Sequence, residues 1–398
     1  MKKNIITYCL LLCSAVALPQ QPDISLLKAK ALIDQKKYDD ALEYLQHPLK
    51  RSVQVYLWLG ECYYDKKDFS KAIRFYLEAD SISKDIASFE LSRCYAEKHE
   101  NSNAIAWLQR HLALNPKKSE LAIVTDPAFA DLDETNEWKS LWKQNWYSDQ
   151  EISRNAIAAL IEKGKASDAL NELERLKDRF VPKHEYFALQ GKAYTKQNLL
   201  EPAIASMNEA ISLYGRSDDY FALRADLFLK TGKYSDAFDD ITKAIHLKPY
   251  VPSYYLKRAE ISRLAANFQV AEADLKIYRE GYPESSETYR QLGLLENARG
   301  NYQNALDYYD KLIDKEQGNA QYFIERGNNA LAVNQIQKAD EDFGMALDLD
   351  PTMQEAYLKK GTTRLILQDT MGACFDWNKA KQLGSSEAAN LVYKHCKE

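Results

Sequence analysis

One alanine recurs through the second half of the chain at a fixed spacing. Twelve residues before each copy lies another small residue, and three before and four after lie mostly large apolar ones. Since alanine fills roughly one position in ten of an average chain, six copies in phase do not arise by chance. A repeat of this kind predicts a protein built from stacked units. The alanines that share this one interval are Ala203, Ala237, Ala271, Ala305, Ala339 and Ala373.

Each unit fits two antiparallel helices. Large apolar residues recur at helical spacing and can bury one face of each helix. The small residues predict points where the two helices cross closely, because a larger side chain would push the backbones apart. Pro249, Pro283 and Pro351 close three of the units, since proline lacks the next backbone N–H. One helix pair cannot bury its apolar faces alone, so neighbouring units must stack into a solenoid.

This pattern of small, aromatic, alanine and aromatic residues resembles the tetratricopeptide repeat (TPR), whose period of about 34 residues is also the interval between the alanines. The segment 220–249, YFALRADLFLKTGKYSDAFDDITKAIHLKP, follows the TPR pattern almost throughout. The resemblance implies an all-α superhelical solenoid of about ten helix-turn-helix repeats in two blocks, with a C-terminal capping helix. The expected boundaries are 1–17 for a signal peptide, 24–116 for three N-terminal repeats, 117–150 for a Trp-rich connector, 151–384 for one divergent and six regular repeats, and 385–398 for the capping helix.

The connector at 117–150 breaks the phase of the repeats. Trp138, Trp142 and Trp146 are four residues apart, so we expect them on one face of one helix. They either join the two blocks as a hydrophobic staple or grip a partner peptide.

The N-terminus has the features of a signal peptide. Lys2 and Lys3 precede a short apolar run at 5–12, and a small-residue cleavage site follows at 15–17. The run is too short to span a bilayer comfortably. We therefore expect export, to the periplasm or to a site associated with the outer membrane, with no integral span after cleavage and with peripheral envelope association open. The alternatives are an uncleaved anchor and a buried first helix in a cytoplasmic protein.

Four cysteines would remain after cleavage. Cys62 and Cys94 occupy the same position of adjacent repeats, about 8–10 Å apart, which predicts free buried thiols. Cys374 and Cys396 are equally distant in sequence from a turn near residue 385, so two antiparallel helices would bring them together. In an oxidising compartment we expect a disulfide there, stabilising the chain by about 3 kcal/mol. Two buried thiols are the alternative.

The end of the chain carries a second resemblance. The segment 372–397 is similar to the closing section of TPR proteins from Gram-negative bacterial envelopes. In those proteins the last helix covers an otherwise exposed apolar face.

The sequence offers little for catalysis or nucleic-acid binding. The net charge is −5, without a basic block to neutralise phosphates. The six histidines are dispersed, and no phosphate loop or nucleophile elbow is present. We expect no catalytic residue, no metal site and no cofactor. An envelope enzyme with a site dispersed over the repeats, or a cytoplasmic TPR regulator, remains the alternative.

The TPR resemblance implies that first helices line a concave groove for a protein or peptide segment of unknown identity. Arg263 and Arg290 would be anion anchors there, while Leu294 and Ile324 depart from the family's carboxylate clamp. Packing between neighbouring repeats is the alternative role. The predicted groove residues are Leu256, Arg263, Leu264, Arg290, Leu294, Asn297, Ile324, Asn328, Leu331, Leu358, Leu365 and Ile366.

Overall fold

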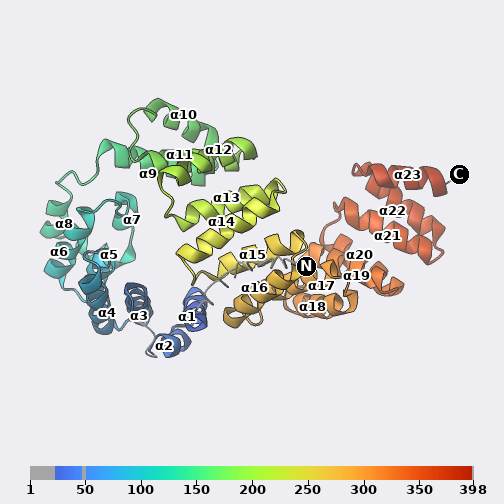
Figure 1. The fold of residues 1–398 in the computed structure, drawn as a ribbon, viewed down its shortest axis with the longest axis horizontal. Coiled ribbons are helices and arrows are strands. Elements are labelled where there is room, and N and C mark those ends of the chain that lie inside the picture. Colours follow the sequence, from blue (N-terminus) through green and yellow to red (C-terminus); the bar gives the residue numbers. More distant parts are fainter. Residues whose placement is uncertain (1–22, 47–50, 397–398) are drawn as a thin grey trace, which may run out of the picture.

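The structure is a computed structural model that describes residues 23–46 and 51–396. Its described residues form helices and the turns between them (Figure 1), which confirms the predicted all-α solenoid. The signal peptide predicted at 1–17 lies outside the described residues.

The described part of the chain contains ten antiparallel helix pairs, followed by one more helix. The three pairs before the connector are α1 (Ile24–Asp34) with α2 (Tyr38–Gln46), α3 (Val53–Asp65) with α4 (Phe69–Ile82), and α5 (Ser88–Glu97) with α6 (Asn101–Leu112). The next four are α9 (Asp149–Glu162) with α10 (Ala166–Leu176), α11 (Lys183–Lys196) with α12 (Leu200–Leu213), α13 (Asp218–Lys230) with α14 (Tyr234–Leu247), and α15 (Pro252–Leu264) with α16 (Phe268–Gly281). The last three are α17 (Ser286–Ala298) with α18 (Tyr302–Lys315), α19 (Ala320–Ala332) with α20 (Ile336–Leu349), and α21 (Gln354–Ile366) with α22 (Thr370–Gln382); α23 (Ser386–His395) ends the described chain.

Every pair turns through one residue in the left-handed region. The φ values lie between 57° at His99 and 79° at Gly300. A left-handed residue directly after a helix ends it and redirects the chain. The ten residues are Lys36, Lys67, His99, Gly164, Asn198, Gly232, Ala266, Gly300, Asn334 and Gln368.

The periodic small residues are where the helices cross. A Cβ added to Gly327 would lie 2.8 Å from the Phe343 ring, and one added to Gly361 would lie 2.6 Å from the Trp377 ring. Larger residues there would force each pair apart. The alanines in phase with the repeat are all fully buried: Ala41, Ala72, Ala104, Ala169, Ala203, Ala237, Ala271, Ala305, Ala339 and Ala373.

The connector consists of short elements: α7 (Glu120–Val124), the 3-10 helix η1 (Pro127–Leu132) and α8 (Asn136–Leu141). The expectation of three tryptophans on one helical face is wrong, because α8 ends at Leu141. Trp142 is its C-cap, and Trp146 lies beyond it, with its indole Nε1 donating to the carbonyl oxygen of Leu141 at 2.8 Å. Trp138 is buried in a core that joins the connector to α5 and α6.

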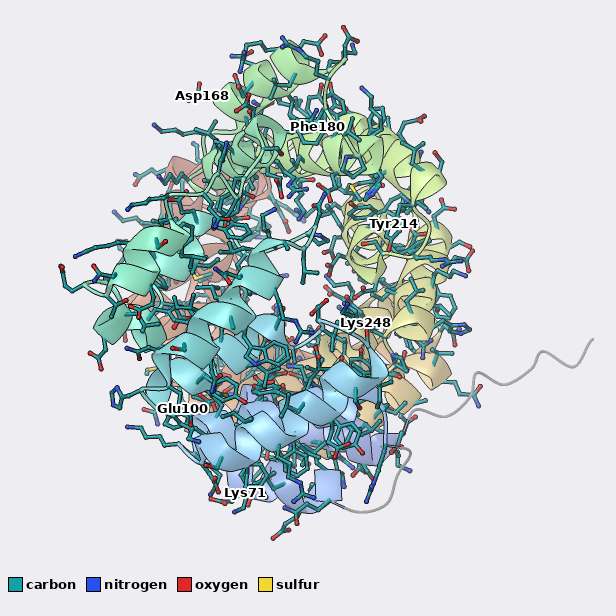
Figure 2. All side chains as sticks on the ribbon, turned by 90° about the vertical axis from the view of Figure 1, so that its left-hand side faces the viewer. Lys71, Glu100, Asp168, Phe180, Tyr214 and Lys248 are labelled. Carbon is teal, nitrogen blue, oxygen red and sulfur yellow. A yellow bond between two sulfur atoms is a disulfide. The ribbon has the colours of Figure 1, made fainter. Side chains whose placement is uncertain are left out.

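The solenoid makes one closed turn, and its last repeats extend beyond it. In Figure 1, α1 lies beside α15 and α16, which come far later in the sequence. Figure 2, turned by 90° from that view, looks onto the resulting ring of helices. The repeats from α17 onward continue away from this ring, to α23 at the far end of the molecule.

The ring is closed by apolar and polar contacts. Leu27 of α1 is fully buried in the core around α13–α15. A Cβ added to Gly281 would lie 2.4 Å from that of Ala31. Lys28 forms an ion pair with Glu280 at 2.8 Å, and Gln35 donates its side-chain amide to the carbonyl oxygen of Gly281 at 2.9 Å. No prediction from the sequence anticipated this closure.

Candidate partner-binding surface

The predicted groove residues divide into three classes by exposure. Leu264 and Ile366 are open to solvent, at 41% and 55%. Ile324 is fully buried among apolar side chains of α18–α20, so its assignment to a partner groove is wrong: its side chain packs in the core. The other nine, which are Leu256, Arg263, Arg290, Leu294, Asn297, Asn328, Leu331, Leu358 and Leu365, are half-buried.

Several half-buried members also stabilise the solenoid. Leu331 packs against the core of α18–α21, and Leu358 and Leu365 pack against the core beneath α23. Asn297 donates its side-chain amide to Asn329 of the next repeat at 2.9 Å. Packing between neighbouring repeats therefore explains part of the apolar character of this surface.

Arg263 and Arg290 differ in their partners. Arg290 forms an ion pair with Glu325 at 2.8 Å, linking two successive first helices. The side chain of Arg263 has no ion pair or hydrogen bond among the described residues, and burial lowers its pKa. A partly desolvated guanidinium without a partner favours the approach of an anion. Glu325 thus balances the charge of Arg290, whereas Arg263 is left as a cation without an ion-pair partner among the described residues.

A ladder of buried ion pairs was missed in the sequence. Arg258 donates from Nε and Nη2 to both carboxylate oxygens of Asp274, at 2.7 and 2.8 Å. Its Nη1 reaches Thr242 of the preceding repeat at 3.4 Å. The same pairing recurs one repeat earlier at Arg224–Asp240 and two repeats later at Arg326–Asp342. The repeat period could have revealed these ion pairs, since the arginines and the aspartates also recur at multiples of the interval between the alanines.

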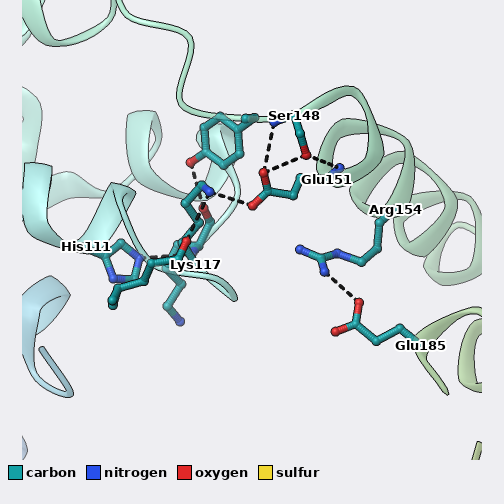
Figure 3. A network of polar contacts seen from close by, with 9 residues as sticks. His111, Lys117, Ser148, Glu151, Arg154 and Glu185 are labelled. Carbon is teal, nitrogen blue, oxygen red and sulfur yellow. Dashed lines mark hydrogen bonds and ion pairs between the residues drawn. The ribbon is translucent and has the colours of Figure 1, made fainter. Parts of the chain in front are cut away.

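A polar network fixes the connector to the second block (Figure 3). Lys117 forms a buried ion pair with Glu151 of α9 at 2.6 Å. Although burial alone would raise it, the pKa of Glu151 is lowered by hydrogen bonds from Lys117 and Ser148. His111 accepts the backbone N–H of Lys118 at its Nε2, at 3.0 Å. Burial, together with the charges of Lys118 and Lys117, lowers the pKa of His111 to about 4, so the ring is neutral at pH 7.

The cysteines fall into two pairs. Cys62 and Cys94 are buried free thiols, and burial raises the pKa of each to about 12. Cys374 and Cys396 form a disulfide with a Cα–Cα distance of 5.7 Å, which holds α23 against α22.

Metal and membrane features are few. In residues 23–46 and 51–396 no group of three His, Cys, Asp or Glu side chains is placed to hold a metal ion. Among the helices of this same part of the chain, none has the length and apolar character needed to cross a membrane.

The repeats match a known family by sequence. Profiles of the tetratricopeptide repeat match residues 26–86, 184–216 and 256–320, which lie in both blocks. The chain contains TPRs. TPRs form a family of repeat scaffolds that is typically non-enzymatic.

Solved TPR structures share the fold at low sequence identity. A tetratricopeptide repeat protein from Parabacteroides merdae is 18% identical, with a TM-score of 0.54, over 62% of this chain and 99% of its own. The Cut9–Hcn1 hetero-tetramer of the APC/C contains a chain that is 16% identical, with a TM-score of 0.52, over 94% of this TPR protein and 83% of its own length.

A human protein, DnaJ homolog subfamily C member 7, is 28% identical over 103 residues. This match covers 26% of the TPR protein described here and 21% of the human relative. The chain therefore spans about a fifth of the length of that relative.

Proposed function

We propose that this TPR protein is a scaffold or adaptor of the bacterial cell envelope that binds a segment of another protein on the first helices of its later repeats. The observation that carries the proposal is Arg263, a half-buried cation with no partner among the described residues, next to the exposed Leu264. A partner segment with an acidic and an apolar residue would satisfy both side chains.

The test is cross-linked capture from envelope fractions with mass spectrometry, comparing the whole protein with the L264D/I366D variant. Leu331 and Leu365 are poorer targets, because they pack against the core and an aspartate there would disturb folding. For proteins that the unchanged chain captures, we expect the captured amount to be at least about tenfold lower with L264D/I366D, as for hot-spot residues. The circular dichroism spectrum should not change.

The matched control is L121D, which places the same charge on an exposed leucine of the connector. Equal capture by L264D/I366D and by the unchanged protein would contradict the groove proposal.

The signal peptide expected from the sequence of residues 1–17 supports the envelope part of the proposal. A disulfide at Cys374–Cys396 fits an oxidising compartment, since cytosolic proteins seldom keep such bonds. N-terminal sequencing of the native protein should find a chain that begins after the 15–17 cleavage site. A soluble protein that still begins at Met1 would contradict export and leave the groove proposal standing.

A further inference from the structure

The outer faces of the second helices carry polar or small residues in every described repeat except the last. The residues two before and two after each in-phase alanine are exposed in all ten repeats. In nine of them the first is Asp, Ser, Glu or Gln and the second is Glu, Arg, Ala, Asn or Asp. In the tenth repeat they are Met371 and Phe375, which are 87% and 59% exposed. Nine repeats fold without a large apolar residue at either position, so the fold does not require this pair.

Met371 and Phe375 form one apolar strip on α22. They are one helical turn apart and lie opposite the buried face of Ala373, Trp377 and Ala380. Large apolar side chains that the core does not use mark an interaction surface when they cluster. A spacing of one turn along a rigid helix suits the ridge of another helix packed alongside it.

A third exposed large apolar side chain lies on the last helix. Tyr393 of α23 is 88% exposed, and it lines a hollow of about 600 Å³ with Lys381 of α22. The disulfide between Cys374 and Cys396 ties α23 to α22, so Tyr393 and the strip lie on two helices that are covalently joined. We call Met371, Phe375, Lys379, Lys381, Tyr393 and Lys394 the terminal patch.

The charge of the terminal patch indicates the chemistry of its partner. Lys379, Lys381 and Lys394 are exposed and form no ion pair with any described residue. The Lys379 ammonium lies 5.9 Å from the centre of the Phe375 ring. In a symmetric dimer through this face the same lysines would face one another, which is unfavourable. Acidic groups beside an apolar strip complement the patch.

We propose that the terminal patch docks an amphipathic helix of a partner protein whose apolar side is flanked by Asp and Glu. The apolar side packs on Met371 and Phe375, and the carboxylates meet the three lysines. Methionine is suited to this role, because its flexible side chain adapts to different surfaces. This site lies on the outer side of a second helix and is separate from the groove proposed above.

The test is selection from a phage-displayed library of random peptides of about 20 residues, long enough for several helical turns. The whole protein is the target, after removal of phage that bind the M371Q/F375E variant. That variant gives α22 the residues that α20 carries at the same places, Gln337 and Glu341, so its fold should be retained. We expect selected peptides to combine Asp and Glu with large apolar residues at helical spacing. Their affinity should fall at least about tenfold for M371Q/F375E and for K379E/K381E.

The control Q337A/E341A, at the same places on α20, should leave the affinity unchanged. The proposal is overturned by a lack of enrichment, by a basic or uncharged consensus, or by equal binding to K379E/K381E. It is also overturned if the protein itself binds vesicles containing phosphatidylglycerol and M371Q/F375E does not, since the patch would then meet a lipid surface. The proposal is overturned too if the protein is a dimer in solution and M371Q/F375E is a monomer, since the patch would then bind a second copy of the chain.

Discussion

At the scale of single residues, buried ion pairs join the two helices of a repeat. Arg258 and Asp274 are both largely buried, and each satisfies the charge of the other. A buried ion pair adds little net stability by itself, whereas removing one partner leaves an uncompensated buried charge. In the next repeat Leu292 and Tyr308 stand at the corresponding positions. The fold therefore accepts either a complete ion pair or a complete apolar pair at this place.

The substitution R258L should lower the free energy of unfolding by about 3–5 kcal/mol, because Asp274 remains buried without its partner. The double variant R258L/D274Y, which copies Leu292 and Tyr308, should lose less than half as much. Urea denaturation of both variants measures the difference. A double variant that is as unstable as R258L would show that the cost comes from packing rather than from the unpaired charge.

At the scale of elements, the regular repeats could be predicted and the connector could not. In the repeats each helix has the same neighbours, so one period fixes the buried Ala305 and the close approach of Gly327 to Phe343. The connector has no such constraint. A spacing of four residues suggested one long helix through Trp146, but the chain leaves the helix after Leu141 to reach α9. The sequence also could not separate Ile324, which lies in the core, from groove residues at equivalent positions.

The His111 site should make the connector sensitive to acid. In the unfolded chain His111 binds a proton near pH 6.5, and in the folded protein only near pH 4. Between these values the unfolded state binds more protons, so stability that is fully present above about pH 6.5 is lost as the pH falls toward 4. The loss should reach up to about 3 kcal/mol.

Urea denaturation at pH 7.5, above the pKa of His111 in the unfolded chain, and at pH 5, below it, measures this dependence. H111Q should reduce it, because glutamine can accept the Lys118 N–H without titrating. H246Q, at an exposed histidine, should leave it unchanged. An identical pH dependence in H111Q and the unchanged protein would rule out His111 as its source.

At the scale of the whole molecule, one glycine lies at the contact between α1 and α16 that closes the ring. Ten residues after the in-phase alanine, five repeats carry leucine, at Leu114, Leu213, Leu247, Leu349 and Leu383, whereas α16 ends in Gly281. The sequence thus contained a sign of the closure, because only α16 has α1 lying against this position. Without the structure this glycine could not be linked to ring closure. A repeat pattern indicates contacts between neighbouring repeats, and not contacts between repeats that lie a full turn of the solenoid apart.

The substitution G281L should open the ring, because its Cβ would lie 2.4 Å from that of Ala31. The first helix pair should lose about 2–3 kcal/mol of stabilisation as Leu27 leaves its site. Small-angle X-ray scattering should then show a larger radius of gyration, with an unchanged circular dichroism spectrum. K315L places leucine at the same position of the next repeat and should leave the radius unchanged. An unchanged radius in G281L would mean that α1 stays docked without the close contact.

The docking of α1 against α16 also has a consequence for synthesis. Leu27 leaves the ribosome early, but the side chains that cover it are made much later, from Phe221 onward. At about 5–20 residues per second this delay is on the order of 10–40 s. During that time the apolar face of α1 that carries Leu27 is exposed to any chaperone or translocation factor that meets the nascent chain.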